Sequence, residues 1–337
     1  MKCCSTCIGD NGLRRILPSL ASESGSCDYC LSKDVLVVEP AALSDLLTPL
    51  IRIYEPDSKG KLLVQWLRVD WGMFEHARMD DARAAALLAE ILDDGEVVRK
   101  LFIPSPSYET DSLSRWEKLR DELMYGNRYF PATEIKKERL EELLKLLKVP
   151  ENELPTDWHR ARLMTDNEPY PIEKMGAPPR EISAHGRANP AGIPYLYLSS
   201  IPTTAVAEIR PHTGENACIA HFQTPPDLSV IDLRSPRHTV SPVDFGDEQE
   251  IGYLRSDLRF LTRLGDELTR PVIPRSAAID YVPSQYLCEF IKKCGYDGVI
   301  YNSSVGEGIN LALFKQEGVV PGDVTVHAVK RVHVEIA

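Results

Sequence analysis

The stretch that decides the fold of this chain is Gly186-Arg-Ala-Asn-Pro-Ala-Gly-Ile-Pro-Tyr-Leu-Tyr-Leu-Ser199, closely followed by Thr203-Thr-Ala-Val-Ala-Glu-Ile-Arg-Pro211. Its first part is rich in glycine and proline, which favour a loop, and this loop carries Arg187. The apolar residues after it predict a strand that ends near Tyr197. A capped turn then presents Glu208, eleven residues beyond Tyr197. The sequence therefore gathers an arginine, a tyrosine and a carboxylate on one loop, strand and turn.

Two further polar stretches lie far from this unit in the sequence. Trp158-His-Arg-Ala-Arg162 carries two arginines two residues apart, so in a strand both would point to the same face. Tyr301-Asn-Ser-Ser-Val-Gly-Glu-Gly-Ile-Asn310 brings hydroxyls and glycines directly after a short apolar run that predicts a strand. Short strands, frequent prolines and glycines, and few helices after residue 155 indicate an α+β domain.

Arginine, tyrosine, glutamate and serine together suit a dinucleotide whose glycosidic bond is to be broken. The planar fork of an arginine binds pyrophosphate oxygens through two parallel hydrogen bonds. An aromatic ring can stack against nicotinamide. A carboxylate near the ribose can hold its hydroxyls and stabilise an oxocarbenium-like transition state. Serine hydroxyls or backbone amides can bind the nicotinamide amide or a phosphate. The set is compatible with a dinucleotide that carries nicotinamide.

The order of these motifs resembles the RES-domain family. The matching patterns are Arg-x-Arg at 160–162, Gly-Arg-x-Asn-Pro within 186–199, Thr-Ala-x-x-Glu-Ile-Arg-Pro at 204–211, and Tyr-x-Ser-Ser with Asn-Leu-x-Leu-Phe within 301–314. The resemblance implies an α+β fold similar to the diphtheria-toxin class of ADP-ribosyltransferases, a split β-sheet with a cleft that holds NAD⁺. The best-known family members are toxins of toxin–antitoxin pairs, which deplete NAD⁺ by hydrolysis or phosphorolysis.

The resemblance also implies which residues act at the reacting bond. By motif, the catalytic residues would be Glu208, Tyr197 and Arg160. Glu208 would be the central carboxylate, and Tyr197 would face the nicotinamide–ribose end of the substrate. Arg160 and Arg162 are alternatives for one contact to the NAD⁺ phosphates.

Further residues are implied to bind the substrate. Arg162 and Arg187 would contact the phosphates, and Ser303 or Ser304 would line the nicotinamide pocket. The run of neighbouring serines leaves the choice between those two open. His159 stands where many family members have a tyrosine, so the sequence does not predict the ring contact at that position.

Five of the eight cysteines lie within the first 30 residues. Cys4-Ser-Thr-Cys7 and Cys27-Asp-Tyr-Cys30 are two Cys-x-x-Cys pairs with 19 residues between them. Two residues between thiolates let each pair bind one tetrahedral ion from a tight turn. We expect Cys4, Cys7, Cys27 and Cys30 to hold a structural Zn²⁺, because complete thiolate coordination leaves no open position for catalysis. Cys3 adjoins Cys4 and is an alternative ligand.

Residues 40–155 show helical patterns. Helices are predicted around residues 43–54 with Pro49 as a kink, after a cap at Asp80 or Asp81, and from about residue 133 to 149 before Pro150. A boundary within residues 150–155 divides the chain into a zinc-binding module (1–39), a helical domain (40–155) and a RES domain (156–337). The first two parts resemble the HEPN/RES N-terminal segments found ahead of some RES domains.

Two helices are predicted in the second half of the chain. One spans roughly residues 248–264, and the other spans roughly residues 283–294. The second is predicted to end at Gly295, because a glycine readily adopts the left-handed conformation that closes a helix.

The pattern Arg180-Glu-Ile-Ser-Ala-His185 has the arginine–histidine spacing of HEPN ribonucleases. In those enzymes the pair lies on one helix, whereas here it lies in a proline-bounded loop. No such pattern occurs in residues 1–155. The sequence therefore gives no support for a ribonuclease.

The composition argues against some classes of protein. A formal net charge of −11 argues against a broad nucleic-acid-binding surface, which needs clustered lysine and arginine. No apolar run approaches the roughly 18 residues of a membrane span, and the first residues lack an apolar signal-peptide core. We expect a soluble, cytoplasmic protein that does not associate with membranes.

The leading functional hypothesis is an NAD⁺ glycohydrolase or phosphorylase that acts as a toxin or phage-defence effector. An ADP-ribosyltransferase that modifies a macromolecule is the alternative, and an inactive zinc-containing binding module is a third hypothesis of another class. An enzyme that consumes NAD⁺ endangers its host. We therefore expect an inhibitory partner, such as the helix-turn-helix antitoxin of many family members, and we also expect a homo-oligomer.

Overall fold

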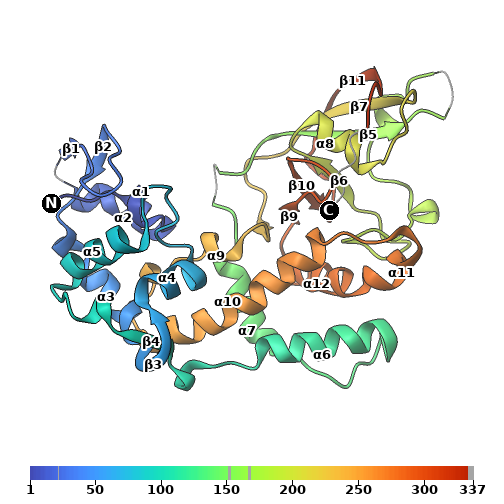
Figure 1. The fold of residues 1–337 in the computed structure, drawn as a ribbon. Helices are drawn as coiled ribbons and strands as arrows, with labels where there is room; N and C mark the ends of the chain where they lie inside the picture. The colour runs from blue at the N-terminus through green and yellow to red at the C-terminus, as the bar shows by residue number, and fades with distance from the viewer. Residues whose placement is uncertain (22, 151–152, 166–167, 333–337) are drawn as a thin grey trace. The chain divides into compact units, whose positions relative to one another are not determined.

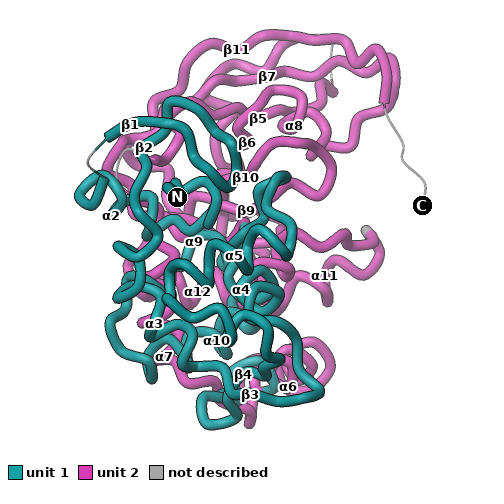
Figure 2. Tube along the Cα trace, turned by 60° about the vertical axis from the view of Figure 1, so that its left-hand side comes forward, with its two compact units in different colours: residues 1–114, 235–262 teal, residues 115–234, 263–337 magenta. Residues whose placement is uncertain are grey.

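A computed structural model describes the chain except for residue 22 and residues 151–152, 166–167 and 333–337. Figure 1 labels its helices and strands along the chain. Two compact units are formed, each from two separate stretches, as Figure 2 shows by colour. Unit 1 comprises residues 1–114 and 235–262, and unit 2 comprises residues 115–234 and 263–337.

Unit 1 is mainly helical. Its helices are α1 (Ser5–Ile8), α2 (Asn11–Leu20), α3 (Ser44–Arg52), α4 (Leu63–Trp71), α5 (Asp81–Leu92) and α9 (Pro236–Thr239). Strands β1 (Glu23–Gly25) and β2 (Val35–Val37) pair antiparallel, as do β3 (Tyr54–Leu62) and β4 (Leu101–Pro104). The helix predicted around residues 43–54 is confirmed as α3, and Pro49 lies within it.

Helix α5 follows the predicted pattern of capping and burial. The side chain of Asp80 accepts a hydrogen bond from the backbone N–H of Arg83 at 2.8 Å, so Asp80 rather than Asp81 is the cap. The buried face of α5 carries Leu87, Leu88 and Ile91. Spacings of one, three and four residues keep these side chains on one stripe of the helix.

Unit 2 contains the main sheet of the protein. Its seven strands are β5 (Asp157–Leu163), β6 (Leu196–Ser199), β7 (Asn216–Gln223), β8 (Val230–Asp232), β9 (Gly298–Asn302), β10 (Ile309–Leu313) and β11 (Val320–Ala328). Their spatial order is β11-β7-β5-β6-β10-β9-β8. Among the strands that the structure describes, only β8 and β9 run parallel, so the sheet is mixed. The α+β class predicted for this region is confirmed.

The sheet is split between β5 and β6. These strands share a single register pair, His159 with Ser199, whereas β5 and β7 pair over their full length. Among the described residues, no further register pair joins β5 to β6. Backbone edges and side chains of both strands therefore border a fork in the middle of the sheet.

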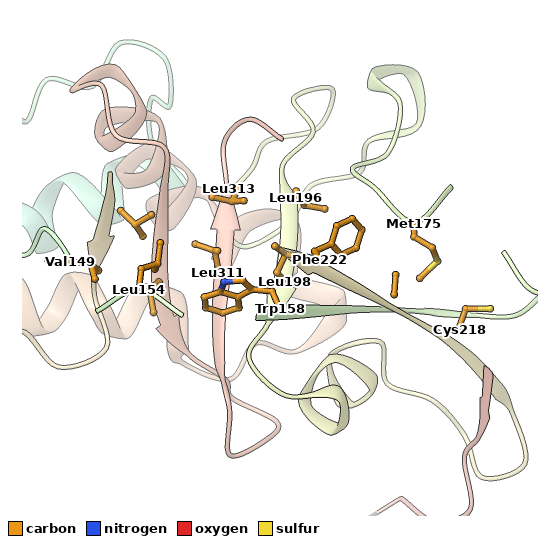
Figure 3. Packing of buried hydrophobic residues seen from close by; sticks show 13 residues of the cluster. Val149, Leu154, Trp158, Met175, Leu196, Leu198, Cys218, Phe222, Leu311 and Leu313 are labelled. Carbon is orange, nitrogen blue, oxygen red and sulfur yellow. The ribbon is translucent and has the colours of Figure 1, made fainter. Parts of the chain in front are cut away.

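One face of this sheet carries the core of unit 2. Leu196 and Leu198 on β6, and Leu311 and Leu313 on β10, are spaced by two residues and so point to the same face. Trp158 on β5 is fully buried in the same cluster. Figure 3 shows these side chains close together across neighbouring strands. The core thereby fixes both sides of the fork.

Helices of unit 2 are α7 (Lys137–Leu146), α8 (Pro202–Glu208), α11 (Ala277–Asp280) and α12 (Val282–Lys293), together with most of α6 (Ser112–Tyr125). Helix α10 (Glu248–Thr269) contributes to both units and ends five residues later than predicted. The predicted stop of α12 is confirmed, because Gly295 adopts a φ of +92°.

Helix α7 is shorter than the helix predicted over residues 133–149. After it ends, the backbone N–H of Val149 donates to the carbonyl of Val230 at 2.9 Å, and that of Asp232 donates to the carbonyl of Leu147 at 2.7 Å. Pairing with the edge of β8 thus replaces the last helical turn. Residues 115–149 belong to unit 2, and residues 151–152 of the predicted boundary lie outside the described residues.

Among the described residues, no helix combines the length and the apolar character that crossing a membrane requires.

Candidate functional site

A cleft of about 330 Å³ lies within unit 2 at the split of the sheet. We call it the fork cleft, and its walls come from β5, β6, β9, β10, α8, the loop before β6 and the start of α12. Its lining residues are His159, Arg160, Ala161, His185, Gly186, Arg187, Tyr197, Leu198, Ser199, Ala205, Glu208, Ile209, Tyr281, Tyr301 and Asn310.

The loop that precedes β6 is held rigid by one buried asparagine. The side-chain amide of Asn189 donates to the carbonyls of Ala184, Pro190 and Ile193 at 2.9–3.0 Å. From α12, Gln285 donates to the carbonyls of Gly186 and Asn189 at 2.8 and 3.0 Å. These bonds place the glycine- and proline-rich motif as one wall of the fork cleft.

Gly186 is required by a close approach in this wall. A Cβ atom there would lie 2.5 Å from Asn189 Oδ1 and 2.6 Å from the hydroxyl of Tyr197. Both atoms are fixed by hydrogen bonds to each other, so neither can move away cheaply. Only a residue without a side chain fits this position.

The hydroxyl of Tyr197 is used for structure. It donates to Asn189 Oδ1 at 2.7 Å and accepts from the backbone N–H of Ala188 at 3.0 Å. Burial raises the pKa of Tyr197 above its usual range, so the hydroxyl stays protonated at neutral pH. Tyr197 lines the fork cleft, and with its hydroxyl engaged the ring is the part that can meet a ligand.

Arg187 is anchored on several sides. Its Nη1 donates to the carbonyls of Leu268 and Arg270 at 3.2 and 2.7 Å, and its Nη2 donates to the hydroxyl of Ser304 at 3.1 Å. The guanidinium lies 5.5 Å from the ring centroid of Tyr281. These bonds use part of its N–H donors, and the others can bind a ligand at the cleft.

Arg160 is buried with incomplete hydrogen bonding. Its Nη1 donates to the carbonyl of Tyr197 at 2.9 Å, while its Nε, among the described residues, has no hydrogen-bond partner. Burial, helped by the charge of Arg162, lowers the pKa of Arg160 to about 10. The unpartnered Nε of this buried guanidinium is a donor that a ligand in the cleft could use.

Arg162 is directed elsewhere. Its Nη2 donates to the carbonyl of Gly176 at 3.2 Å, and its guanidinium lies 6.0 Å from the ring centroid of Tyr170. It is not among the residues that line the fork cleft. Of the two arginines that the sequence left as alternatives, the structure brings Arg160 to the cleft.

Glu208 ends α8 at the rim of the fork cleft, where it is exposed. Its Oε1 accepts from the hydroxyl of Ser303 at 2.7 Å and from the amide of Asn310 at 2.6 Å. Asn310 is buried, and its Oδ1 accepts from the hydroxyl of Ser199 at 2.7 Å. A chain of hydrogen bonds thus fixes the orientation of the carboxylate.

The two neighbouring serines have different partners. Ser303 binds the carboxylate of Glu208, whereas Ser304 binds the guanidinium of Arg187. The geometry gives each hydroxyl its own contact with a predicted site residue.

Several lining residues escaped prediction from the sequence. Asn310 and Tyr301 lay inside the motif that carried the serines, but an asparagine and a tyrosine on strands are ordinary core residues until their neighbours are known. Burial raises the pKa of Tyr301 well above its usual range. His185 belongs to the arginine–histidine pattern that gave no support for a ribonuclease, and Tyr281 lies just before a predicted helix, so neither was expected at the cleft.

His159 lines the fork cleft from β5. Its ring lies 5.6 Å from that of His221, which binds Asp157 at 2.9 Å. Burial, followed by the charge of His221, lowers the pKa of His159. Its imidazole is therefore neutral at neutral pH.

The four predicted cysteines come together in unit 1. Their sulfur atoms all lie within 4.8 Å of one another, and all four residues are buried. The Sγ–Sγ distances are 3.7 Å for Cys4–Cys7, 3.5 Å for Cys4–Cys30 and 3.0 Å for Cys7–Cys27. Tetrahedral zinc with thiolates separates its sulfurs by about 3.8 Å, which two of these distances approach and the Cys7–Cys27 distance falls short of; four thiolates are a donor set that zinc takes.

Cys3 is not part of this set. Its backbone pairs with Val38 through two hydrogen bonds of 2.9 Å, which directs the chain so that Cys4 joins the other cysteines. The alternative register with Cys3 as a ligand does not occur.

A second cavity, of about 410 Å³, lies within unit 1. Two of its three lining arginines form ion pairs: Arg255 binds Glu109 at 2.5 Å, and Arg237 binds Glu75 at 2.9 Å. It contains none of the residues predicted from the motifs. The fork cleft is therefore the candidate site.

Comparison with known proteins agrees with this assignment of the motifs. The family model described as "RES domain" matches residues 156–333, more than half of the chain. A similar solved structure is the MbcT–MbcA toxin–antitoxin complex of M. tuberculosis, with 13% sequence identity and a TM-score of 0.34 over 57% of this chain and 93% of that chain. No curated protein matches the chain.

Proposed function

The chain belongs to the RES-domain family, and on that premise we propose that it binds NAD⁺ in the fork cleft and cleaves the nicotinamide–ribose bond. The proposal covers a glycohydrolase, which uses water, and a phosphorylase, which uses inorganic phosphate. We also propose that residues 156–337 have an ADP-ribosyltransferase-like fold, in which the split between β5 and β6 forms the substrate cleft.

The reaction balances without a further cofactor. The bond between the ribose C1′ and the nicotinamide nitrogen breaks, and its electron pair stays with nicotinamide, which leaves as a neutral molecule. A water oxygen forms the new bond to C1′ and one proton is released, which gives ADP-ribose. Phosphate as the acceptor gives the 1-phosphate of ADP-ribose. Because the leaving group is already cationic, positioning and electrostatics supply most of the barrier lowering.

The observation that carries this proposal is the fixed carboxylate of Glu208. Ser303 and Asn310 both donate to Oε1, so among the described residues Oε2 has no protein partner. A carboxylate oriented in this way can bind the ribose hydroxyls or stabilise positive charge that develops at C1′. Its exposed position at the cleft rim leaves room for the ribose and an acceptor.

The phosphates would bind at two arginines of the cleft. Arg160 has a buried Nε without a partner among the described residues, and Arg187 holds its guanidinium against Tyr281. Both side chains line the same cleft as Glu208. Anchored guanidinium groups lose little entropy when they bind a pyrophosphate, which makes them effective anion ligands.

Turnover of NAD⁺ by the purified protein, followed as release of nicotinamide with and without phosphate, tests the proposal. We expect Glu208→Gln to lower kcat by about 100-fold or more, because the carboxylate acts on the transition state. Glu215→Gln is the matched control, since this nearby carboxylate binds the backbone of His212 and does not line the cleft. Intact NAD⁺ at high enzyme concentration under both conditions would contradict the proposal.

A macromolecular acceptor is the second candidate. It is favoured by the exposure of Glu208, since a protein or nucleic acid could reach the cleft rim as water does. NAD⁺ labelled in its ADP-ribose half and mixed with lysate distinguishes the two reactions. Label on a macromolecule would favour transfer, and label only on free ADP-ribose or its phosphate would favour cleavage.

We further propose that Cys4, Cys7, Cys27 and Cys30 hold a structural Zn²⁺. The donor set supports this, because four buried sulfurs surround one point and the backbone N–H of Cys30 donates to Cys27 Sγ at 3.5 Å. An N–H bond to a sulfur stabilises its thiolate form.

Restraint of the activity is part of the proposal. A protein that depletes NAD⁺ would act as a toxin, and we propose an inhibitory protein partner, such as a helix-turn-helix antitoxin. Homo-oligomerisation, and the division of the chain at residues 39 and 155, stay predictions from the sequence.

A further inference from the structure

A buried carboxylate, Glu267, lies near the end of α10 and has three arginine partners. Its side chain is fully buried. It accepts from Arg120 Nε at 2.8 Å, from Arg263 Nη1 at 2.9 Å and from Arg270 Nε at 3.2 Å. The arginines are largely buried too, so the cluster is screened little by water and each charge depends strongly on the others.

One of these arginines connects the cluster to the wall of the fork cleft. Arg270 also donates through Nη2 to the carbonyl of Asp280 at 2.7 Å. The next residue is Tyr281, whose ring lies beneath the guanidinium of Arg187. The side chain of Arg270 therefore joins Glu267 to the turn that carries this aromatic ring.

The same segment also supplies the carbonyls that hold Arg187. Its Nη1 donates to the carbonyls of Leu268 and Arg270, the residue after Glu267 and the third after it. Carbonyls at the end of α10 lack helical partners and carry the negative end of the helix dipole, so they are good acceptors for a cation. Both supports of Arg187 thus converge on the segment fixed by Glu267.

We propose that Glu267 is a positioning residue that aims Arg187 into the fork cleft, where Arg187 binds the substrate pyrophosphate. The inference rests on the proposed NAD⁺ chemistry for the identity of the ligand. Glu267 does not line the cleft itself, so it acts only through the carbonyls and the ring that hold Arg187.

Loss of the carboxylate charge would release this arrangement. With Gln at position 267, the guanidinium groups of Arg120, Arg263 and Arg270 would face a neutral amide. The remaining carboxylates, Glu117 beside Arg263 and Asp280 beside Arg270, would offset their mutual repulsion only in part. Arg270 would turn outward, and the last turn of α10 would shift with it. A shift on the order of 1 Å is enough to spoil a bidentate contact with phosphate.

One partner of Glu267 comes from outside the stretch that matches the RES domain. Arg120 lies on α6, whereas the match begins at residue 156. On the same helix, Glu117 binds Arg263 at 2.5 Å. The positioning of Arg187 therefore depends on a helix that this chain adds to the family domain.

Binding of ADP-ribose, which holds the pyrophosphate but cannot be cleaved at the nicotinamide bond, tests the positioning role directly. We expect Glu267→Gln in the full chain to raise the Kd for ADP-ribose and the KM for NAD⁺ about tenfold, with kcat changed less than about twofold, because phosphate contacts bind ground and transition states alike. In an Arg187→Ala background the same change should add almost nothing, since the two residues act in series.

Asp70→Asn is the matched control, because Asp70 is a buried carboxylate of unit 1 that accepts from the hydroxyl of Tyr54 at 3.0 Å. It should lower thermal stability and leave the Kd for ADP-ribose unchanged. If the Glu267 variant does not fold, Arg270→Gln cuts the same connection, and it should also weaken ADP-ribose binding.

Unchanged ADP-ribose binding in a folded Glu267 or Arg270 variant would overturn the positioning role. Equal weakening by Asp70→Asn would overturn it as well, because the effect would then follow general stability. If the unaltered protein binds ADP-ribose but does not turn over NAD⁺, the proposed function fails. The positioning role is then still tested by the Kd for ADP-ribose of the Glu267 and Arg270 variants.

Discussion

At the scale of single residues, the hydrogen bonds separate groups that can react from groups that support them. The hydroxyl of Tyr197 is fully engaged with Ala188 and Asn189, behind the wall of the fork cleft. The carboxylate of Glu208 is oriented by side chains, yet it remains exposed at the rim. Both residues were expected at the reacting bond, and their surroundings assign them different tasks.

Removal of the Tyr197 hydroxyl should affect stability more than chemistry. We expect Tyr197→Phe to destabilise unit 2 by about 1–3 kcal/mol, because the N–H of Ala188 and the amide oxygen of Asn189 lose their partner in a buried place. Loss of kcat should be slight, since burial raises the pKa of this hydroxyl and keeps it from exchanging protons at neutral pH. Thermal unfolding and NAD⁺ turnover measure the two effects.

Tyr197→Ala is the companion variant, in which the ring is lost as well as the hydroxyl. It should lower kcat/KM by a further factor of ten or so, because a stacked ring contributes about 0.5–1.5 kcal/mol beyond burial. A fall in kcat for Tyr197→Phe as large as that for Glu208→Gln would instead assign acid–base chemistry to the hydroxyl.

At the scale of elements, segments that flank the family domain are built into unit 2. Residues 147–149 pair with β8 at the edge of the sheet, and α6 supplies partners to buried charges of α10. Conversely, residues 235–262 belong to unit 1 although they lie within the stretch that matches the RES domain. Each unit therefore needs both of its stretches.

This interleaving has a consequence for proteolysis. We expect the pieces of a chain cut near residue 155 to elute together in gel filtration under native conditions and to separate only in denaturant. The physical reason is that a piece from residue 156 onward would expose the apolar and charged partners of residues 115–149. A stable, separate fragment that begins near residue 156 would contradict the expectation and favour the boundary predicted from the sequence.

At the scale of the whole molecule, the two candidate sites lie in different units. The cysteine cluster is in unit 1, and every residue that lines the fork cleft is in unit 2. A structural ion contributes free energy to the unit that holds it, since a thiolate site does not exist in the unfolded chain. Metal removal should accordingly act on stability and leave the chemistry of the cleft in place.

Metal analysis of the purified protein should find one zinc per chain. Cys27→Ser should lose the ion and lower the melting temperature of unit 1. Cys294 lies outside the cluster, so Cys294→Ser should keep the ion and leave the melting temperature unchanged. The Kd for ADP-ribose should stay unchanged in either variant. A metal content far from one per chain would rule out the four-thiolate site.

Much of the candidate site could be predicted from the sequence because its residues sit in short local motifs. The prolines of the loop before β6 fix their own φ angles, and Gly186 in that loop fits only without a side chain. The two Cys-x-x-Cys turns likewise bring each pair of thiolates together locally. Motif order along the chain then sufficed to indicate the family.

Only the tertiary structure decided which of these residues meet. Arg160 and Arg162 are alike in sequence, but Arg160 lines the cleft beside the single β5–β6 register pair, whereas Arg162 donates to the carbonyl of Gly176. The neighbours Arg263 and Arg270 make Glu267 look like an ordinary helix ion pair, and its third partner, Arg120, lies 147 residues away in the sequence. Long-range pairing depends on packing free energy summed over the whole unit, which local motifs do not encode.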